Sequence, residues 1–293
     1  MKKLFMAVIA LMMTISASAQ FYIYCSDGNV IKVDSISMIA PEESEQPNPS
    51  AGIGVFSVSA DKQVTFSKGN LWYHPANNEW RFAENQTDYI GDANSNCSST
   101  YNGWLDLFGW STSSTNFGVS TSTSSSDYSG SFVDWGTNKI GTDAPNTWRT
   151  LTYDEWNYLL NVRNNASSLK GVAQVNGVNG LILLPDNWTC PTGVTFKSGF
   201  YSEWGVEIYY AAYQTFTAAE WSKLESAGAV FLPAAGIRFG SNVYNVLDDG
   251  YCWSATGYDS YYAYGLFFES GRADMYYDIG RYNGQAVRLV KDL

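Results

Sequence analysis

The side chains that could do chemistry are few in this chain and far apart. Its one histidine, His74, comes directly before a proline and is expected in a turn. No serine stands in a Gly-x-Ser-x-Gly elbow, no two acids can be matched as general acid and base, and no phosphate-binding glycine motif opens a helix. The sequence therefore predicts a protein that is not an enzyme and that carries no cofactor.

The four cysteines are Cys25, Cys97, Cys190 and Cys252. No two of them have the C-x-x-C spacing of a zinc or redox site, so no metal ligand is predicted. In an oxidising compartment they could form a disulfide framework with three possible full pairings, while unpaired, buried thiols are at least as good an interpretation. If one bridge forms, we favour Cys190–Cys252, because both cysteines adjoin expected core segments.

The stretch from Tyr251 to Arg288 alternates two kinds of residue. Large apolar residues typical of a buried framework are Trp253, Leu266, Phe267, Val287 and Leu289. Between them stand aromatic rings with a polar tip and short polar side chains, the composition that binding surfaces favour. The candidate ligand-binding residues are Tyr258, Asp259, Tyr261, Tyr262, Tyr264, Asp274, Tyr276, Tyr277, Asp278, Arg281, Tyr282 and Asn283. Ordinary β-structure is the alternative interpretation of such a tyrosine-rich run.

Residues 262–269 are expected to form a strand with two distinct sides. Alternation places Tyr262, Tyr264, Leu266 and Phe268 on one side, and Ala263, Gly265, Phe267 and Glu269 on the other. We expect the tyrosine rings to emerge at the loop end of this strand. There they would join the other candidate tyrosines and aspartates in one patch.

Three motifs near the C-terminus resemble the closing segment of bacterial C-type-lectin-like domains. They are Gly-Tyr-Cys-Trp-Ser-Ala-Thr at 250–256, Ala-Tyr-Gly-Leu-Phe-Phe at 263–268 and Gly-Gln-Ala-Val-Arg-Leu-Val at 284–290. Similar families are the Fibrobacter succinogenes major paralogous domain, the formylglycine-generating-enzyme fold and the variable proteins of diversity-generating retroelements. Over about residues 55–291 the chain also resembles exported proteins of Bacteroidota that have the same C-terminal motifs. The resemblance implies an α+β, C-type-lectin-like fold with many short strands and two main helices.

Two functional signatures of this class can be compared with the sequence. Calcium-dependent sugar binding uses a Glu-Pro-Asn or Gln-Pro-Asp tripeptide and a Trp-Asn-Asp triplet. Here Gln46-Pro47-Asn48 lies in an expected linker, and Ser254-Ala255 follow Trp253, so the resemblance implies binding that is independent of Ca²⁺. The formylglycine-generating branch needs a cysteine pair, and no second cysteine is close to Cys252 in the sequence.

Composition narrows the choice of compartment and partner. Aromatic residues make up 16% of the chain and charged residues 15%, which is typical of a β-rich extracellular protein. The formal net charge of -11 repels phosphate backbones and anionic membranes, so nucleic acid is not expected as a partner. No stretch after residue 19 is long and apolar enough to predict a membrane span.

The N-terminus has the organisation of a secretory signal peptide over residues 1–19. Lys2-Lys3 precede an apolar segment, and Ala17-Ser18-Ala19 form a small-residue cleavage site. We expect the mature chain to begin at Gln20 without a lipid, because no cysteine stands at the cleavage point. The expected location is the periplasm, the cell surface or the extracellular space.

The remaining chain is expected to form one large domain behind a short attachment. Residues 20–40 predict a small β segment, a hairpin with Asp27-Gly28 at its turn, and residues 41–51 have the composition of a linker. The domain proper covers 52–293, a size of about 240 residues that suits a single core. Its first two hairpins are expected within 55–66 and 69–82, the second around Asn77-Asn78.

Two helices are predicted from capping boxes. Thr152 with Glu155, and Thr217 with Glu220, have the Thr-x-x-Glu spacing that starts a helix, so Glu155 is interpreted as a cap rather than as a catalytic acid. Buried strands are expected at 180–185 and 230–236. The Ser/Thr-rich run from Ser111 to Ser131 lacks apolar surface and is expected to be a long exposed loop.

These observations favour an exported or cell-surface, adhesin-like protein. It would recognise a protein or glycan ligand through its Tyr/Asp-rich C-terminal face, without calcium. A structural or fimbria-associated assembly protein is the first alternative. A relative of the formylglycine-generating enzymes is the second.

Overall fold

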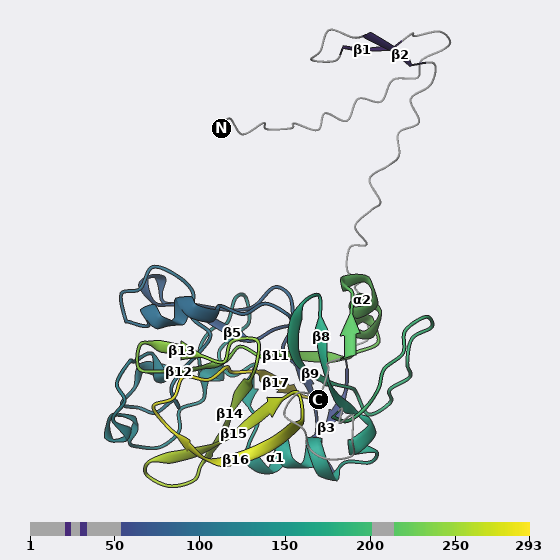
Figure 1. Ribbon diagram of the computed structural model, residues 1–293. Coiled ribbons are helices and arrows are strands. Elements are labelled where there is room, and N and C mark those ends of the chain that lie inside the picture. Colours follow the sequence, from purple (N-terminus) through teal and green to yellow (C-terminus); the bar gives the residue numbers. More distant parts are fainter. Residues whose placement is uncertain (1–20, 25–29, 34–53, 201–213) are drawn as a thin grey trace. The chain divides into compact units, whose positions relative to one another are not determined.

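The computed structural model describes residues 21–24, 30–33, 54–200 and 214–293 (Figure 1). The chain divides into two units, Met1–Gln46 and Pro47–Leu293. In the first, β1 (Phe21–Tyr24) and β2 (Val30–Val33) pair antiparallel as the expected hairpin. The signal peptide, the Asp27-Gly28 turn and the expected linker over 41–51 lie outside the described residues.

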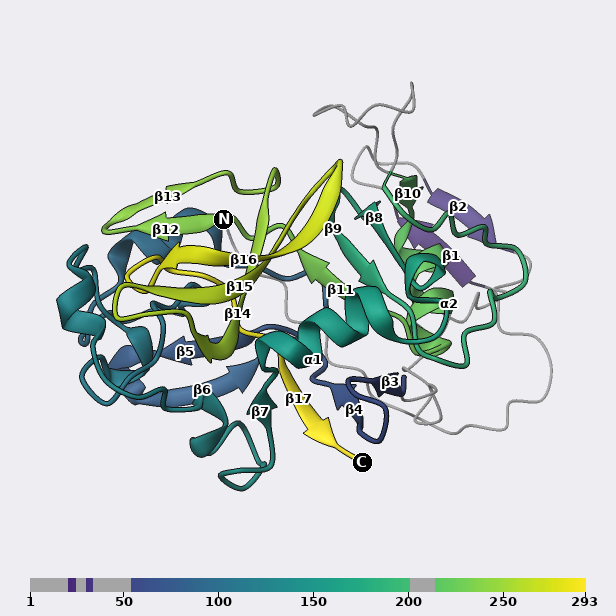
Figure 2. The same cartoon turned by 90° about the horizontal axis from the view of Figure 1, so that it is seen from below.

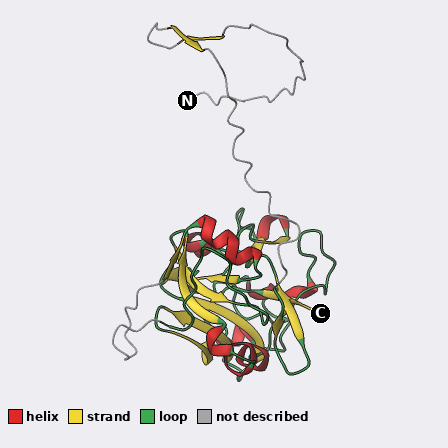
Figure 3. Cartoon of the chain, turned by 90° about the vertical axis from the view of Figure 1, so that its right-hand side faces the viewer, coloured by secondary structure: helices red, strands yellow, loops and turns green. Residues whose placement is uncertain are grey.

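The second unit is an α+β structure with many short strands, as expected (Figure 3). The helix α1 (Tyr153–Asn157) continues into a π-helical turn at Tyr158–Val162, and α2 covers Ala218–Ser226. Short 3₁₀-helical segments lie at Pro75–Asn77, Gly91–Asn96, Asn116–Gly118, Ser125–Tyr128, Trp135–Thr137 and Ala166–Ser168.

Both predicted capping boxes are confirmed. The Thr152 hydroxyl accepts from the Glu155 N–H at 3.2 Å, and the Glu155 carboxylate accepts from the Thr152 N–H at 2.9 Å. Glu155 also accepts from the guanidinium of Arg149 at 2.7 Å. A carboxylate bonded in this way is a helix cap and an ion-pair partner, which accounts for its burial without any catalytic role.

One sheet has the strand order β10-β8-β9-β11. Its last two strands overlap the expected strands at 180–185 and 230–236, and the second of them ends at Pro233 rather than at 236. Its strands are β10 (Gln214–Phe216), β8 (Lys170–Val175), β9 (Val178–Leu183) and β11 (Val230–Pro233). Helix α2 covers one face, where Trp221 lies 5.6 Å from Phe231, ring centroid to ring centroid. Leu224 and Ile182 belong to the same buried cluster.

A second sheet, β3-β4-β17-β7, brings the two ends of the domain together. Its strands are β3 (Phe56–Ser57), β4 (Gln63–Phe66), β17 (Leu289–Asp292) and β7 (Arg149–Thr150). The last strand of the chain, β17, pairs antiparallel with both β4 and β7 and is therefore an interior strand.

The third sheet consists of β14 (Gly250–Gly257), β15 (Tyr262–Glu269) and β16 (Arg272–Gly280), and two core clusters pack against it. Leu266 and Phe268 belong to the same core cluster as Trp156 of α1, which lies beside this sheet (Figure 2). Trp253 and Ala263 belong to a different cluster. The predicted alternation along β15 is confirmed, and all five expected framework residues are buried.

Two further hairpins complete the domain. β5 (Leu71–His74) pairs with β6 (Glu79–Phe82) around the expected turn, where Asn78 has a φ of 49° in the left-handed region that asparagine tolerates. β12 (Ile237–Phe239) pairs with β13 (Asn242–Tyr244). His74 ends β5 directly before the turn and is buried.

The Ser/Thr-rich segment is a long loop, as predicted, and every residue of 120–131 except Tyr128 is exposed or half-buried. Burial is nevertheless found within it, because Ser111 and Tyr128 are fully buried and Val119 is buried with them. The Tyr128 hydroxyl donates to the carbonyl oxygens of Ser120 and Ser122. Two apolar side chains, Val119 and Tyr128, therefore anchor a largely exposed loop, which the Ser/Thr composition did not predict.

The expected Cys190–Cys252 bridge is wrong. Cys97, Cys190 and Cys252 are free, while Cys25 lies outside the described residues. Cys252 lies in β14 within the core, whereas Cys190 is exposed on a loop, where its thiol contacts the carbonyl oxygen of Val194. That both cysteines adjoin core segments in the sequence did not imply that their side chains meet in the fold.

Candidate functional site

Large apolar side chains exposed to solvent gather on two hairpins. Of seven such residues in the described part of the chain, two lie on β12–β13 and three at the β14–β15 turn. The five are Phe239 (44% exposed), Tyr244 (50%), Tyr258 (50%), Tyr261 (57%) and Tyr262 (39%). Three of the predicted ligand-binding tyrosines are therefore exposed.

Hydrogen bonds to one carboxylate fix the β14–β15 turn. An oxygen of Asp259 accepts from the N–H groups of Tyr261 at 2.7 Å and Tyr262 at 2.8 Å, and the Tyr258 N–H donates to the Tyr262 carbonyl. Asp259, predicted as a ligand contact, thus holds the backbone that presents the tyrosines. A turn fixed in this way offers its rings with little loss of backbone freedom on binding.

Arg281 is buried, in contrast to the prediction that it contacts ligand. It is 7% exposed, and its guanidinium donates to the carbonyl oxygens of Tyr262, Tyr128 and Gly130. The guanidinium carbon also lies 4.2 Å from the ring centroid of Trp110. Burial lowers the pKa of Arg281, and the charge of Asp259 opposes that shift. Arg281 therefore ties the turn to the Ser/Thr-rich segment.

Tyr264 is half-buried rather than part of an open patch. Its ring lies 4.3 Å from that of Tyr153 in α1 and 5.6 Å, edge-on, from that of Tyr258. Helix α1 covers this side of β15, which period-two alternation alone could not predict. Tyr258 remains exposed at the end of this stack.

Tyr282 connects the two hairpins. Its ring meets that of Phe239 edge-on at 5.5 Å. A Cβ atom on Gly280 would lie 2.7 Å from the Tyr282 ring, so this ring covers Gly280, which pairs with Tyr262. We define the hairpin surface as the following set: Phe239, Tyr244, Tyr258, Tyr261, Tyr262 and Tyr282.

The remaining candidates lie elsewhere or cannot be placed. Asp278 and half-buried Asn283 line a shallow depression of about 250 Å³ together with Ile237, Tyr251, Phe267, Arg272 and Ile279. Asp274 is exposed further along β16, opposite Phe267. The backbones of Tyr276 and Tyr277 lie in β16, and their side chains are outside the described part. The candidates thus do not form the single patch that we predicted.

Sequence reasoning missed Phe239 and Tyr244. The signal was available, because the apolar–polar alternation of 237–244 surrounds a Gly240-Ser241 dipeptide, a composition typical of a hairpin turn. Gly240 has a φ of 60°, which such a turn needs.

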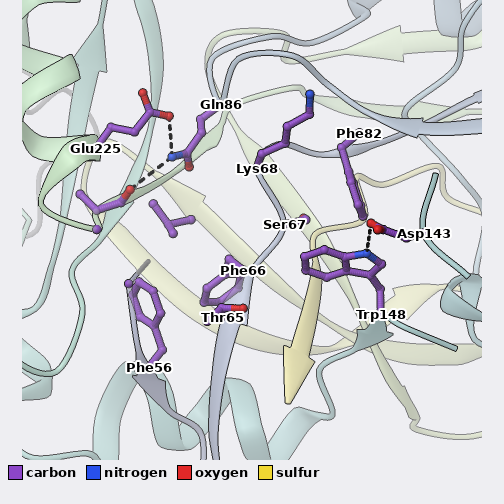
Figure 4. A pocket seen from close by; sticks show the side chains of 14 residues that line it. Phe56, Thr65, Phe66, Ser67, Lys68, Phe82, Gln86, Asp143, Trp148 and Glu225 are labelled. Carbon is purple, nitrogen blue, oxygen red and sulfur yellow. Dashed lines mark hydrogen bonds between the residues drawn. The ribbon is translucent and has the colours of Figure 1, made fainter. Parts of the chain in front are cut away.

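A separate pocket of about 410 Å³ lies between β4, β6 and the end of α2 (Figure 4). Its aromatic lining is Phe56, Phe66, Phe82 and Trp148. The amide of Gln86 bonds Glu225, the Ala229 carbonyl and the Phe231 N–H, while Asp143 accepts from the indole of Trp148. Gln86 and Asp143 are thus bonded within the fold.

Two titratable groups with large pKa shifts, Cys252 and Asp106, lie in the core. Burial raises the pKa of the Cys252 thiol to about 12, so this thiol is protonated at neutral pH and is a poor nucleophile. Burial also raises the pKa of Asp106 to about 6, although Asn94 donates to its carboxylate. Within the described ranges, no three His, Cys, Asp or Glu side chains could together hold a metal ion.

No family model, curated protein or solved structure matches the chain. In the part of the chain that the structure describes, no helix is long and apolar enough to cross a membrane.

Proposed function

We propose that this protein is an exported, adhesin-like binding protein that recognises a protein or glycan ligand through the hairpin surface. The observation that carries the proposal is the concentration of exposed aromatic side chains on two neighbouring hairpins. A soluble protein rarely exposes contiguous apolar area without an interaction that uses it. The C-type-lectin-like fold and the calcium-independence of binding are parts of the same proposal.

The hydrogen bonds around the β14–β15 turn favour a role in recognition, because they hold the exposed tyrosines on an ordered turn. Asp259 and Arg281 bond the backbone around the β14–β15 turn, and neither side chain needs to move for the tyrosines to contact a partner. Tyrosine brings a large contact area at low entropic cost, and a central one contributes about 2 kcal/mol or more when truncated. A turn held by these hydrogen bonds, with exposed tyrosine rings, is an arrangement that suits protein or glycan recognition.

The test uses the full chain in protein and glycan arrays, followed by Tyr261→Ala and Tyr262→Ala variants. Both residues are exposed, so we expect the free energy of unfolding to change by about 0.5 kcal/mol or less, while ligand capture weakens about 30-fold or more. Tyr158→Ala, which removes a half-buried tyrosine outside the hairpin surface, is the matched control.

Unchanged capture in both hairpin variants would contradict the proposal. Self-association of the full chain that the same two substitutions abolish would instead assign the hairpin surface to assembly, the structural alternative. A loss of stability equal to that of a core substitution would show that the rings hold the fold.

A further inference from the structure

A cluster of aromatic and cationic side chains lies on the β5–β6 hairpin, apart from the hairpin surface. Trp72 and Arg81 are directly paired across the two strands, and His74 and Glu79 form the next pair but one. The guanidinium carbon of Arg81 lies 4.0 Å from the ring centroid of Trp104 and 5.0 Å from that of Trp72. We call Trp72, His74, Arg81 and Trp104 the indole cluster.

The indole cluster has hydrogen-bond donors without acceptors. In the described part of the chain, nine buried side-chain nitrogen and oxygen atoms have no partner, and three belong to this cluster: Trp72 Nε1, His74 Nδ1 and Arg81 Nε. The guanidinium of Arg81 has one ion pair, with Glu84 at 3.8 Å, which is longer than a hydrogen bond. His74 is itself only 8% exposed. Buried polar groups of a native fold are usually paired with protein atoms, ordered water, an ion or another molecule.

The residue types define what that molecule must offer. Tryptophan and arginine nitrogens only donate, so the missing atoms are acceptor oxygens. The half-buried rings of Trp72 and Trp104 offer flat apolar faces that remain partly open to solvent. The exposed carboxylates of Glu79, on the same hairpin, and Glu84, 3.8 Å from Arg81, can accept from hydroxyl groups. Hydroxyl groups on a ring with an apolar face meet all three requirements, since each hydroxyl both accepts and donates.

We propose that the indole cluster is a second binding site, which takes an uncharged saccharide. The sugar ring lies against an indole face, and its hydroxyl oxygens accept from Trp72 and Arg81. Because the guanidinium of Arg81 has no hydrogen bond to break, it can leave its place between the two indoles and bond the sugar. Glu79, Glu84 and the net charge of -11 disfavour an acidic sugar.

The test is saturation-transfer NMR on the full chain with three neutral tetrasaccharides, of glucose, galactose and mannose units, and a galacturonic acid tetrasaccharide. We expect at least one neutral probe to receive saturation with a Kd of about 1 mM or lower, and the acidic probe to bind more weakly. Trp104→Ala and Arg81→Gln should each weaken binding about tenfold or more. Trp188→Ala and Lys139→Gln, a half-buried tryptophan and an exposed cation elsewhere, should not.

Four results would overturn the proposal. They are no transfer to any neutral probe at about 5 mM, tighter binding of the acidic probe, equal effects of Trp104→Ala and Trp188→Ala, and full binding by Arg81→Gln. Melting curves show whether the Trp104→Ala variant is folded. If that variant is unfolded, the Arg81→Gln variant still tests the proposal. Sugar binding that survives Tyr261→Ala separates this site from the proposed function, so that either can fail alone.

Discussion

Arg281 and Arg81 each lie over an indole ring, at 4.2 Å from Trp110 and 4.0 Å from Trp104, yet their surroundings are opposite. Arg281 is buried and donates to three carbonyl oxygens of two separate segments. Arg81 is half-buried and has only a long ion pair with an exposed glutamate. The same pair of residue types therefore fastens the fold in one region and leaves donors unused in the other. The hydrogen bonds that each arginine makes, rather than the residue types in contact, distinguish these two roles.

The largest expected difference concerns the two indoles. Trp110→Ala removes a buried ring whose Nε1–H donates to the Ser254 carbonyl, so we expect it to lower the free energy of unfolding by about 3–5 kcal/mol. Trp104→Ala removes a half-buried ring with no such bond and should cost about 1–2 kcal/mol. Urea unfolding of both variants measures the difference. Equal losses would mean that the indole cluster is as structural as the region around Arg281.

The two arginines should differ in the same sense by a smaller amount. Arg281→Gln leaves buried carbonyl oxygens without a donor, which predicts a loss of about 2–3 kcal/mol. Arg81→Gln removes a weak surface ion pair and a partly exposed cation–π contact, for which about 1 kcal/mol or less is expected. Urea denaturation measures both losses, provided that the dependence of the unfolding free energy on urea concentration is the same in each variant. A loss of about 2 kcal/mol or more from Arg81→Gln would mean that the Arg81 side chain stabilises the fold about as much as Arg281 does.

The smallest expected effect is that of a chelator on the hairpin surface. One oxygen of Asp259 is already bonded by two backbone N–H groups, which is a poor arrangement for Ca²⁺, a cation that needs six to eight oxygen ligands. Thermal melts of the full chain with and without EDTA should coincide. A melting temperature that falls by several degrees in EDTA would mean that a bound metal ion, and not only hydrogen bonds to the backbone, holds the turn.

Local signals in the sequence predicted the elements, and long-range packing determined which residues the site contains. The capping boxes at Thr152 and Thr217 and the turn at Asn78 depend on neighbours within four residues, so they could be read directly. The burial of Arg281 depends on carbonyl oxygens some 150 positions earlier in the chain, which no local pattern encodes. Tyr264 was misplaced for the same reason, because α1 comes from a distant segment.

The hairpin surface itself was only partly predictable. Exposed tyrosines at 258–262 follow from a turn between two apolar strands, whereas their connection to Phe239 through Tyr282 requires the tertiary structure. The unpaired donors of the indole cluster could not be predicted either. Whether a tryptophan nitrogen finds an acceptor depends on which carbonyl groups the fold brings to it.

The interior position of β17 has a consequence for how the second sheet assembles. Residues 289–292 separate β4 from β7, so without them β4 pairs only with β3, and β7 has no partner in this sheet. The sheet is therefore completed by pairing across more than 200 residues of sequence, a non-local step of the kind that slows folding. A substitution that keeps residues 289–292 out of the sheet would leave β3–β4 and β7 as separate pieces of the structure.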